Sequence, residues 1–222
     1  HPFKHYDWRY NGEKNQWQGG FGKLVLGETW VAHHGRHKQQ STRGIIADES
    51  HDHPLVNGID DGAIWGPTDV YRVRTPLDAD AENIIMGQTI DRTGDFDDTD
   101  TLYGMRESDD KIAMDIMSDD PEKTYNPNLP MPPLVWTKSY QLPGGSSGRA
   151  LTSTIGASTD MLDEEVRRLF VNAVYHLLDM EVPEKANVTI VGSYTPSAFS
   201  FHDDEHWDTM HLLVEDQIWP KR

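Results

Sequence analysis

The chain has 222 residues, enough to bury a hydrophobic core, and this length favours a single domain. Asp and Glu number 37 against 20 Lys and Arg, which gives a formal net charge of -17. Nucleic acid is therefore not an expected partner, because its phosphates would be repelled. The sequence contains no run of about 20 apolar residues of the kind that spans a membrane, so membrane insertion is not expected.

The first part of the chain, residues 1–44, predicts long loops with short elements. It is rich in His, Trp, Gly and Gln, and it has little periodicity outside the apolar run at residues 23–26. Residues 43–47 predict a strand. Residues 53–59 predict a turn that leads into one helical turn, because Pro suits the first position of a helix and Gly its end.

Four β-branched runs bounded by Gly, Pro and Asp predict further strands. They cover residues 70–73, 83–90, 134–140 and 149–155. The Pro- and Gly-rich segment 141–148 predicts a turn that joins the last two of them as a hairpin. Residues 91–133 are acidic and rich in Pro, which predicts a long surface excursion and no second domain.

The clearest predicted element is a helix over residues 160–180. Apolar side chains from Leu162 to Leu178 recur at helical spacing and form one stripe, so we expect the helix to pack against the sheet. Carboxylates at 163–165 favour the helix start, and a side chain at 158–160 can cap it. Residues 187–191 are compatible with another strand, and residues 195–222 form a tail that could be an arm onto another subunit.

Histidines are concentrated near the start of the chain, where seven of the eleven lie within the first 53 residues. His33 and His37 would share one face of a helix, and imidazole nitrogens suit zinc or a similar metal. Gly35 weakens that helix, so the alternative is that these histidines bond to the backbone and to polar neighbours in packed loops. His51 and His53 flank an Asp and leave the same two alternatives.

Three further patterns resemble cation sites. Residues 95–100 lack the Gly and Glu that a calcium loop requires, so a solvated acidic face is favoured. Residues 202–206 could clamp a cation, although polar runs near a terminus are usually solvated. A chain that begins with His1 also admits a copper site at the terminal amine, if His1 is the true terminus.

Aromatic residues alternate with amides and carboxylates in segments 6–10 and 17–20. Carbohydrate clefts use this composition, because sugar faces stack on rings and hydroxyl groups need polar partners. Packed loops use tryptophan in the same way, so the residues leave both a sugar cleft and a structural role open.

The chain also contains longer segments that are typical of one known family. They are residues 20–35 (GFGKLVLGETWVAHHG), 40–44 (QSTRG), 53–59 (HPLVNGI), 61–71 (DGAIWGPTDVY), 133–138 (PLVWTK), 148–149, 156–160 and 167–175. Together they resemble the trehalose-utilisation (ThuA-like) family of the class I glutamine amidotransferase-like superfamily, in a planctomycete-type branch. The resemblance covers about residues 1–194.

This resemblance implies an α/β fold, a flavodoxin-like three-layer sandwich, with a role around sugar metabolism. Family members usually begin with strands and helices that precede the matched segments. The resemblance therefore implies that residues 1–194 are the C-terminal portion of the domain, lacking its N-terminal strands. Residues 195–222 would be a tail or arm.

The resemblance and the side-chain chemistry together give two sets of candidate residues. The catalytic candidates are His33, His34, Arg43, His53, Asp69, Tyr71 and Lys138. The substrate-binding candidates are His1, His5, Trp8, Trp17, Trp30 and Trp65. We expect a His or Asp to remove a proton from a sugar or keto-sugar while Arg43, Lys138 or a divalent metal such as zinc stabilises the oxyanion.

The alternative function is a non-catalytic carbohydrate-binding or scaffold domain of a multidomain protein. In either case the expected partner is a carbohydrate or keto-sugar, with a homo-oligomer or larger assembly as a further expectation. Cysteine is absent, which excludes disulfides and thiolate metal sites but does not choose between cytoplasm and periplasm. A periplasmic or secreted location is slightly favoured.

Overall fold

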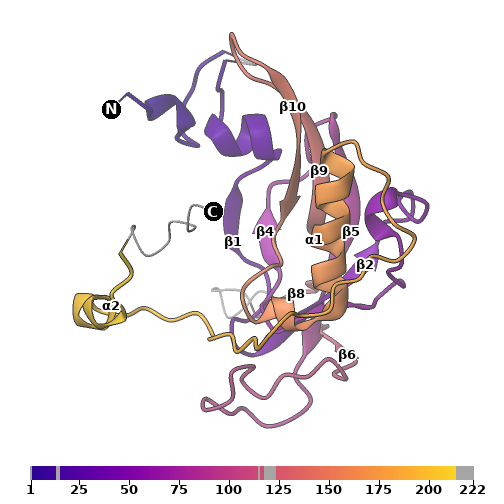
Figure 1. Cartoon of the computed structure of the whole chain (residues 1–222), viewed down its shortest axis with the longest axis vertical. Coiled ribbons are helices and arrows are strands. Elements are labelled where there is room, and N and C mark those ends of the chain that lie inside the picture. The colour runs from indigo at the N-terminus through magenta and orange to yellow at the C-terminus, as the bar shows by residue number, and fades with distance from the viewer. Residues whose placement is uncertain (1, 14–15, 115, 118–123, 214–222) are drawn as a thin grey trace.

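The computed structural model describes residues 2–13, 16–114, 116–117 and 124–213. Its helical elements are the short turns η1 (Lys4–Tyr6), η2 (Gly22–Leu26), η3 (Pro54–Val56) and η4 (Asp160–Leu162), and the α-helices α1 (Glu164–Leu177) and α2 (Asp204–Met210). Its strands are β1 (Trp30–His33), β2 (Gln40–Ile46), β3 (Ile64–Gly66), β4 (Tyr71–Val73), β5 (Ala81–Asp91), β6 (Lys111–Ile112), β7 (Ile116–Met117), β8 (Thr124–Tyr125), β9 (Pro133–Gln141) and β10 (Ser147–Ser153). Figure 1 shows their arrangement.

A six-stranded antiparallel sheet organises the chain. Its strand order is β10-β9-β5-β2-β3, and β6 pairs with the end of β5. The β9–β10 ladder runs from Gln141 paired with Ser147 to Val135 paired with Ser153, which confirms the predicted hairpin. Two small antiparallel ribbons, β1–β4 and β7–β8, lie outside this sheet.

The predicted α/β, flavodoxin-like three-layer sandwich is wrong. Every described strand pair is antiparallel, and one long helix, α1, follows the last strand of the sheet. A parallel sheet needs a crossover of a dozen or more residues between neighbouring strands, usually a helix. Here β9 and β10 are joined by a tight turn, and β5 and β9 by the acidic excursion, so neighbouring strands run in opposite directions.

The predicted elements themselves are mostly confirmed. The expected strands correspond to β2, β4, β5, β9 and β10, and the single helical turn after His53 is η3. The long predicted helix is divided into η4 and α1, because Asp163 has an extended backbone and caps α1 by accepting a hydrogen bond from the Val166 amide at 2.8 Å. Residues 187–191 form no strand.

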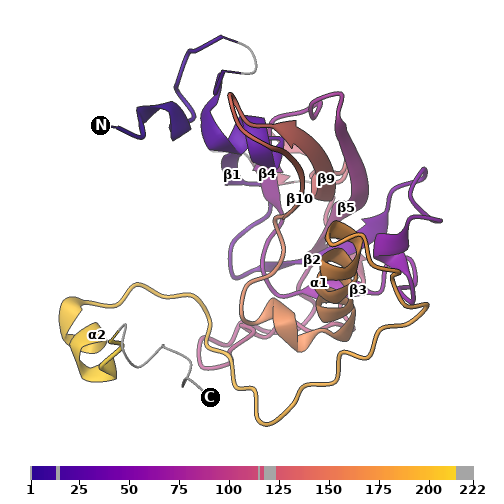
Figure 2. The same ribbon diagram turned by 45° about the horizontal axis from the view of Figure 1, so that its top comes forward.

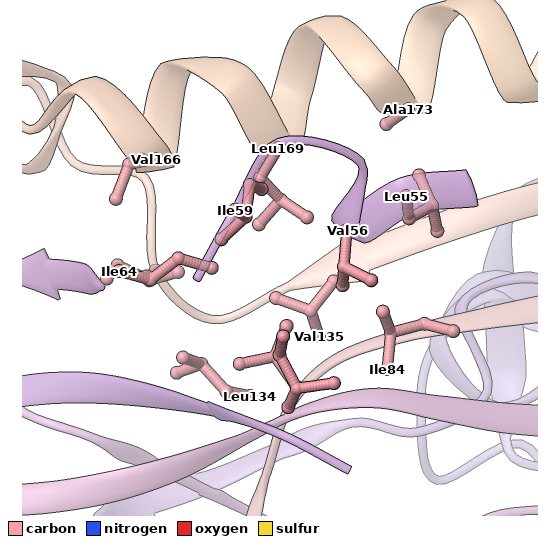
Figure 3. Packing of buried hydrophobic residues seen from close by; sticks show 13 residues of the cluster. Leu55, Val56, Ile59, Ile64, Ile84, Leu134, Val135, Val166, Leu169 and Ala173 are labelled. Atoms are coloured by element: carbon pink, nitrogen blue, oxygen red, sulfur yellow. The ribbon is translucent and has the colours of Figure 1, made fainter. Parts of the chain in front are cut away.

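The hydrophobic core lies between α1 and one face of the sheet. Val166, Leu169 and Ala173 of α1 point toward the sheet in Figure 3, with Leu55 beside them and Val135 beneath. Both Leu169 and Val135 are fully buried. Apolar burial of this kind supplies most of the stabilisation of a small domain.

The N-terminal segment covers the opposite face. Neighbouring residues of a strand point to opposite faces, so Trp136 faces away from α1 when Val135 faces it. The Trp136 indole donates a hydrogen bond to the carbonyl oxygen of Leu26 in η2 at 2.6 Å. The β1–β4 ribbon lies on the same side as η2, away from α1 (Figure 2).

The described part of the acidic excursion is held against this body, whereas the tail extends away from it as far as α2. Arg43 ties the excursion down by donating hydrogen bonds to the carbonyl oxygens of Glu107 at 2.7 Å and Asp109 at 3.1 Å. The Tyr194 hydroxyl donates to the Ser158 carbonyl oxygen, and the Ser158 hydroxyl donates to the Ser197 carbonyl oxygen. Beyond Ser197 the chain runs outward to α2 (Figures 1 and 2). In the part of the chain that the structure describes, no helix has the length and apolar character needed to cross a bilayer.

The core predicts a sharp contrast between two leucines of the α1 region. Leu169→Ala should lower the free energy of unfolding by about 2–5 kcal/mol, because it opens a cavity in the buried cluster. Leu178→Ala, at a side chain that is 64% exposed, should change it by less than about 0.5 kcal/mol. Urea unfolding followed by circular dichroism measures both, and equal losses would contradict the assigned core.

Candidate metal centre

Two histidines and one aspartate converge where the β1–β4 ribbon ends. His33 is the last residue of β1 and pairs with Tyr71, the first residue of β4, and Asp69 lies two residues before Tyr71. The His33 Nδ1 atom is 2.7 Å from Asp69 Oδ2, and the His37 Nδ1 atom is 3.0 Å from Asp69 Oδ1. Strand pairing therefore joins residues that are 36 positions apart in the sequence.

A tight loop, and not a helix, brings His37 to the same carboxylate. The amides of His34 and Gly35 both donate to the carbonyl oxygen of Val70, at 2.8 and 3.2 Å. A side chain at Gly35 would place its Cβ atom 3.3 Å from the Asp69 Cβ atom, so the absence of one lets the loop approach the aspartate closely. Gly35 therefore disfavours a helix over these residues but permits the tight loop that brings His37 to Asp69.

Burial and ligand chemistry fit these three residues to a divalent cation. The Asp69 side chain is 1% exposed, whereas His33 and His37 are each 46% exposed. One ligand atom from each residue lies within 4.8 Å of the other two. Two imidazoles and a carboxylate suit zinc and related first-row metals, and three protein ligands leave a position for a substrate.

An aromatic cleft of about 630 Å³ adjoins this cluster. Trp30, Tyr71, Trp136 and Phe170 line it, together with Thr68 and Asp160. The rings of Trp30 and Tyr71 also contact the His33 ring, at centroid distances of 5.9 and 5.2 Å. We call this space the aromatic cleft; its volume is in the range that small-molecule sites occupy.

Two polar groups shape the cleft wall. Burial, and then the charges of Asp69 and Asp160, raise the pKa of the Tyr71 hydroxyl, so it stays protonated and can donate a hydrogen bond. Asp160 is fully buried and accepts hydrogen bonds from the Thr68 hydroxyl and from the amides of Gly156 and Ala157. Asp160 therefore anchors the wall beside Asp69.

The structure brings together some of the predicted catalytic residues and separates the others. His33, Asp69 and Tyr71 meet at the cluster. His34 turns inward, with Nε2 2.6 Å from the Pro127 carbonyl oxygen, and burial lowers its pKa. The remaining three lie elsewhere: Arg43 holds the acidic excursion, His53 caps η3, and Lys138 lines a different cleft.

The predicted substrate-binding residues are similarly divided. Trp30 lines the aromatic cleft, whereas Trp65 is 4% exposed and belongs to the interior. His5 and Trp17 pack against each other in the N-terminal segment, and Trp8 lies nearby, stacked on Arg9 and Arg74. His1 lies outside the described residues.

The candidate residues that sequence reasoning left out are His37, Thr68, Asp160 and Trp136. The spacing of His37 from His33 pointed to a shared metal, but neither was assigned as a ligand. No sequence pattern around Thr68, Asp160 or Trp136 predicts their place in the aromatic cleft, because each reaches it through long-range packing. Among the described residues, the two other acidic or histidine-rich patterns form no such cluster: His202 and His206 stack at 3.7 Å on an exposed arm, and Asp100 pairs with Arg106.

Comparison of the chain with protein-family models, curated proteins and solved structures finds no match. The resemblance to the ThuA-like family therefore stays a prediction. The case for function rests on the geometry of the site.

His53 lies against His176, with ring centroids 5.0 Å apart, and this pair predicts acid sensitivity. Burial lowers the pKa of both, and the neighbouring His176 charge lowers the pKa of His53 further, while Glu82 opposes these shifts. Because the folded chain then binds protons less readily than the unfolded chain, their stabilisation is complete above about pH 6.5 and is lost as the pH falls through the folded pKa.

The double variant His53→Asn, His176→Gln should therefore lose less stability than the wild type between pH 7 and about pH 5. In the wild type, the Leu55 amide donates a hydrogen bond to His53 Nδ1 at 3.1 Å, and the Asn side chain keeps an acceptor for this amide. Burial raises the pKa of Asp163 to about 6, which acts in the opposite direction in both proteins and cancels in the comparison. Urea unfolding across this range measures the difference, with exposed His51→Gln as control; identical pH profiles would contradict the pair's role.

Proposed function

We propose that the chain binds a divalent metal ion, zinc or a similar first-row cation, through His33, His37 and Asp69, and acts there on a sugar or keto-sugar in the aromatic cleft. The observation that carries the proposal is the convergence of three ligand atoms within 4.8 Å around a carboxylate that is 1% exposed. A buried carboxylate requires charge compensation, and two half-exposed imidazoles beside it can supply a cation site.

The chain's own residues support chemistry on a hydroxylated carbonyl compound. The bound cation would act as a Lewis acid toward a carbonyl or hydroxyl oxygen. The Tyr71 side chain lines the cleft, and its hydroxyl would donate a hydrogen bond to an oxygen that gains negative charge. The Trp30 ring, 53% exposed, offers a face on which a sugar ring can stack. Arg43 and Lys138 are not needed as oxyanion partners in this proposal.

The alternative remains a non-catalytic carbohydrate-binding domain that uses the same cleft. A thermal-shift screen of mono- and disaccharides and their keto forms, with product analysis, distinguishes the two. Turnover that requires the metal supports the enzyme, and sugar-dependent stabilisation without turnover supports the binding domain.

The metal site predicts that the untagged chain binds about one equivalent of Zn²⁺. Asp69→Asn and His37→Gln should each weaken that binding by more than about 10–100-fold, the range seen for losses in the outer shell alone. Isothermal titration and elemental analysis after dialysis measure the affinity and the stoichiometry. His51→Gln, an exposed histidine outside the cluster, is the matched control. Unchanged binding in Asp69→Asn would contradict the site.

Tyr71→Phe should separate metal binding from action on the substrate. The Zn²⁺ affinity should stay unchanged, because the hydroxyl is not one of the three ligands. Turnover of the sugar found in the screen should fall by about 100-fold, as when an oxyanion donor is removed. Tyr175→Phe on α1 is the matched control, and full activity of Tyr71→Phe would remove the hydroxyl from the mechanism.

A further inference from the structure

A second cleft, of about 800 Å³, also borders η2. Its lining includes Gln18, Lys23 of η2, Asp78 and Asp80 before β5, and Lys138 and Tyr140 of β9. We call it the polar cleft. Its size is in the range of small-molecule sites, and none of its residues belongs to the metal centre.

A row of alternating charges runs from Glu28, which lines the aromatic cleft, through four side chains that line the polar cleft. Lys23 contacts Glu28 and lies 2.9 Å from Asp78 Oδ1, and Lys138 lies 3.4 Å from Asp78 Oδ2 and 2.6 Å from Asp80 Oδ1. The order along the row is therefore carboxylate, ammonium, carboxylate, ammonium, carboxylate. Partial burial opposes protonation of Lys23, yet its hydrogen bonds to Glu28 and Asp78 raise its pKa, so it stays charged at neutral pH.

The side chains of the row that line the cleft differ in burial. The Lys138 side chain is 5% exposed, so its ammonium is held at the base of the cleft. Asp78 is 36% exposed and Asp80 57% exposed, so ligand groups can reach both carboxylates. An ammonium has three donors and a carboxylate about four acceptor positions, so each can bond to more than one group.

We propose that the polar cleft binds a neutral polyhydroxylated ligand, a sugar unit or a polyol, independently of the metal centre. A hydroxyl group donates one hydrogen bond and accepts others, so it fits between a carboxylate and an ammonium. Three carboxylates disfavour an anionic ligand, and the two lysines already occupy the places that a cationic ligand would take. Hydrogen bonds to charged groups are stronger than those between neutral groups, which favours the replacement of water at these side chains by ligand hydroxyl groups.

Tyr140 supplies an apolar surface beside this row. A Cβ atom at Gly148, its partner across the β9–β10 ladder, would lie 2.5 Å from the Tyr140 hydroxyl oxygen. The tyrosine side chain therefore lies across Gly148, and Tyr140 lines the cleft. A sugar ring needs such an aromatic face for its C–H groups as well as polar partners for its hydroxyls.

The test is binding of glucose, trehalose and myo-inositol to the full chain by NMR titration and isothermal titration, with sodium sulfate and ethylamine as charged probes. At least one polyol should bind, with amide shifts around Lys138 and Tyr140. Asp80→Asn and Lys23→Met should each weaken it by about tenfold, which corresponds to loss of one hydrogen bond to a charged group. Asp98→Asn, in the exposed excursion, is the charge-matched control and should bind as the wild type does.

Three outcomes would overturn the proposal: no polyol shifts these amides, sulfate or ethylamine binds there more tightly than every polyol, or both variants bind as the wild type does. Circular dichroism of each variant verifies the fold, and the exposed Asp80 gives a substitution that leaves the core intact. Asp69→Asn separates the two sites, because it removes the proposed cation ligand and should leave polyol binding in the polar cleft unchanged.

Discussion

The hydrogen bond from the Trp136 indole to the carbonyl of Leu26 holds the N-terminal segment on the sheet, and both clefts depend on this contact. Trp136 is 1% exposed, and its Nε1 atom lies 2.6 Å from that oxygen. Gly27 has a φ of +94°, and a Cβ atom there would lie 2.7 Å from the same Nε1 atom, so the turn requires glycine. Trp136 lines the aromatic cleft, and Lys138, two residues along the same strand face, lines the polar cleft.

The local elements of the fold could be predicted from the sequence, but the flavodoxin-like arrangement that the family resemblance implies is wrong. Strand runs, the β9–β10 turn and the stripe of α1 are patterns within one segment, so periodicity and turn chemistry find them. The parallel arrangement came from a family resemblance and not from such a pattern. The short links in the chain already argued against it, because nine residues between the runs 70–73 and 83–90 cannot hold a crossover helix.

The candidate site was only partly predictable, for a related reason. The chemistry of His33 and Asp69 makes both candidates, but their contact arises from the pairing of β1 with β4, which no local pattern specifies. The spacing of His33 and His37 suggested one helix face, and Gly35 argued against that helix. A loop explains both observations, because the hydrogen bonds from the His34 and Gly35 amides to the Val70 carbonyl oxygen fold it over Asp69. Spacing predicted proximity, and tertiary contacts determined how it is reached.

One ion pair connects the walls of the two clefts. Glu28 lines the aromatic cleft with a side chain that is 3% exposed, and its partner Lys23 lines the polar cleft. Separating them would leave a buried charge unpaired at a cost of about 3–5 kcal/mol, more than the roughly 1.5–3 kcal/mol that a new hydrogen bond to a charged group returns. A ligand in the polar cleft must therefore bond to Lys23 while the ion pair between Lys23 and Glu28 stays intact. The row is rigid at the Glu28 end and adaptable at the exposed Asp80 end, so both clefts can be occupied at the same time.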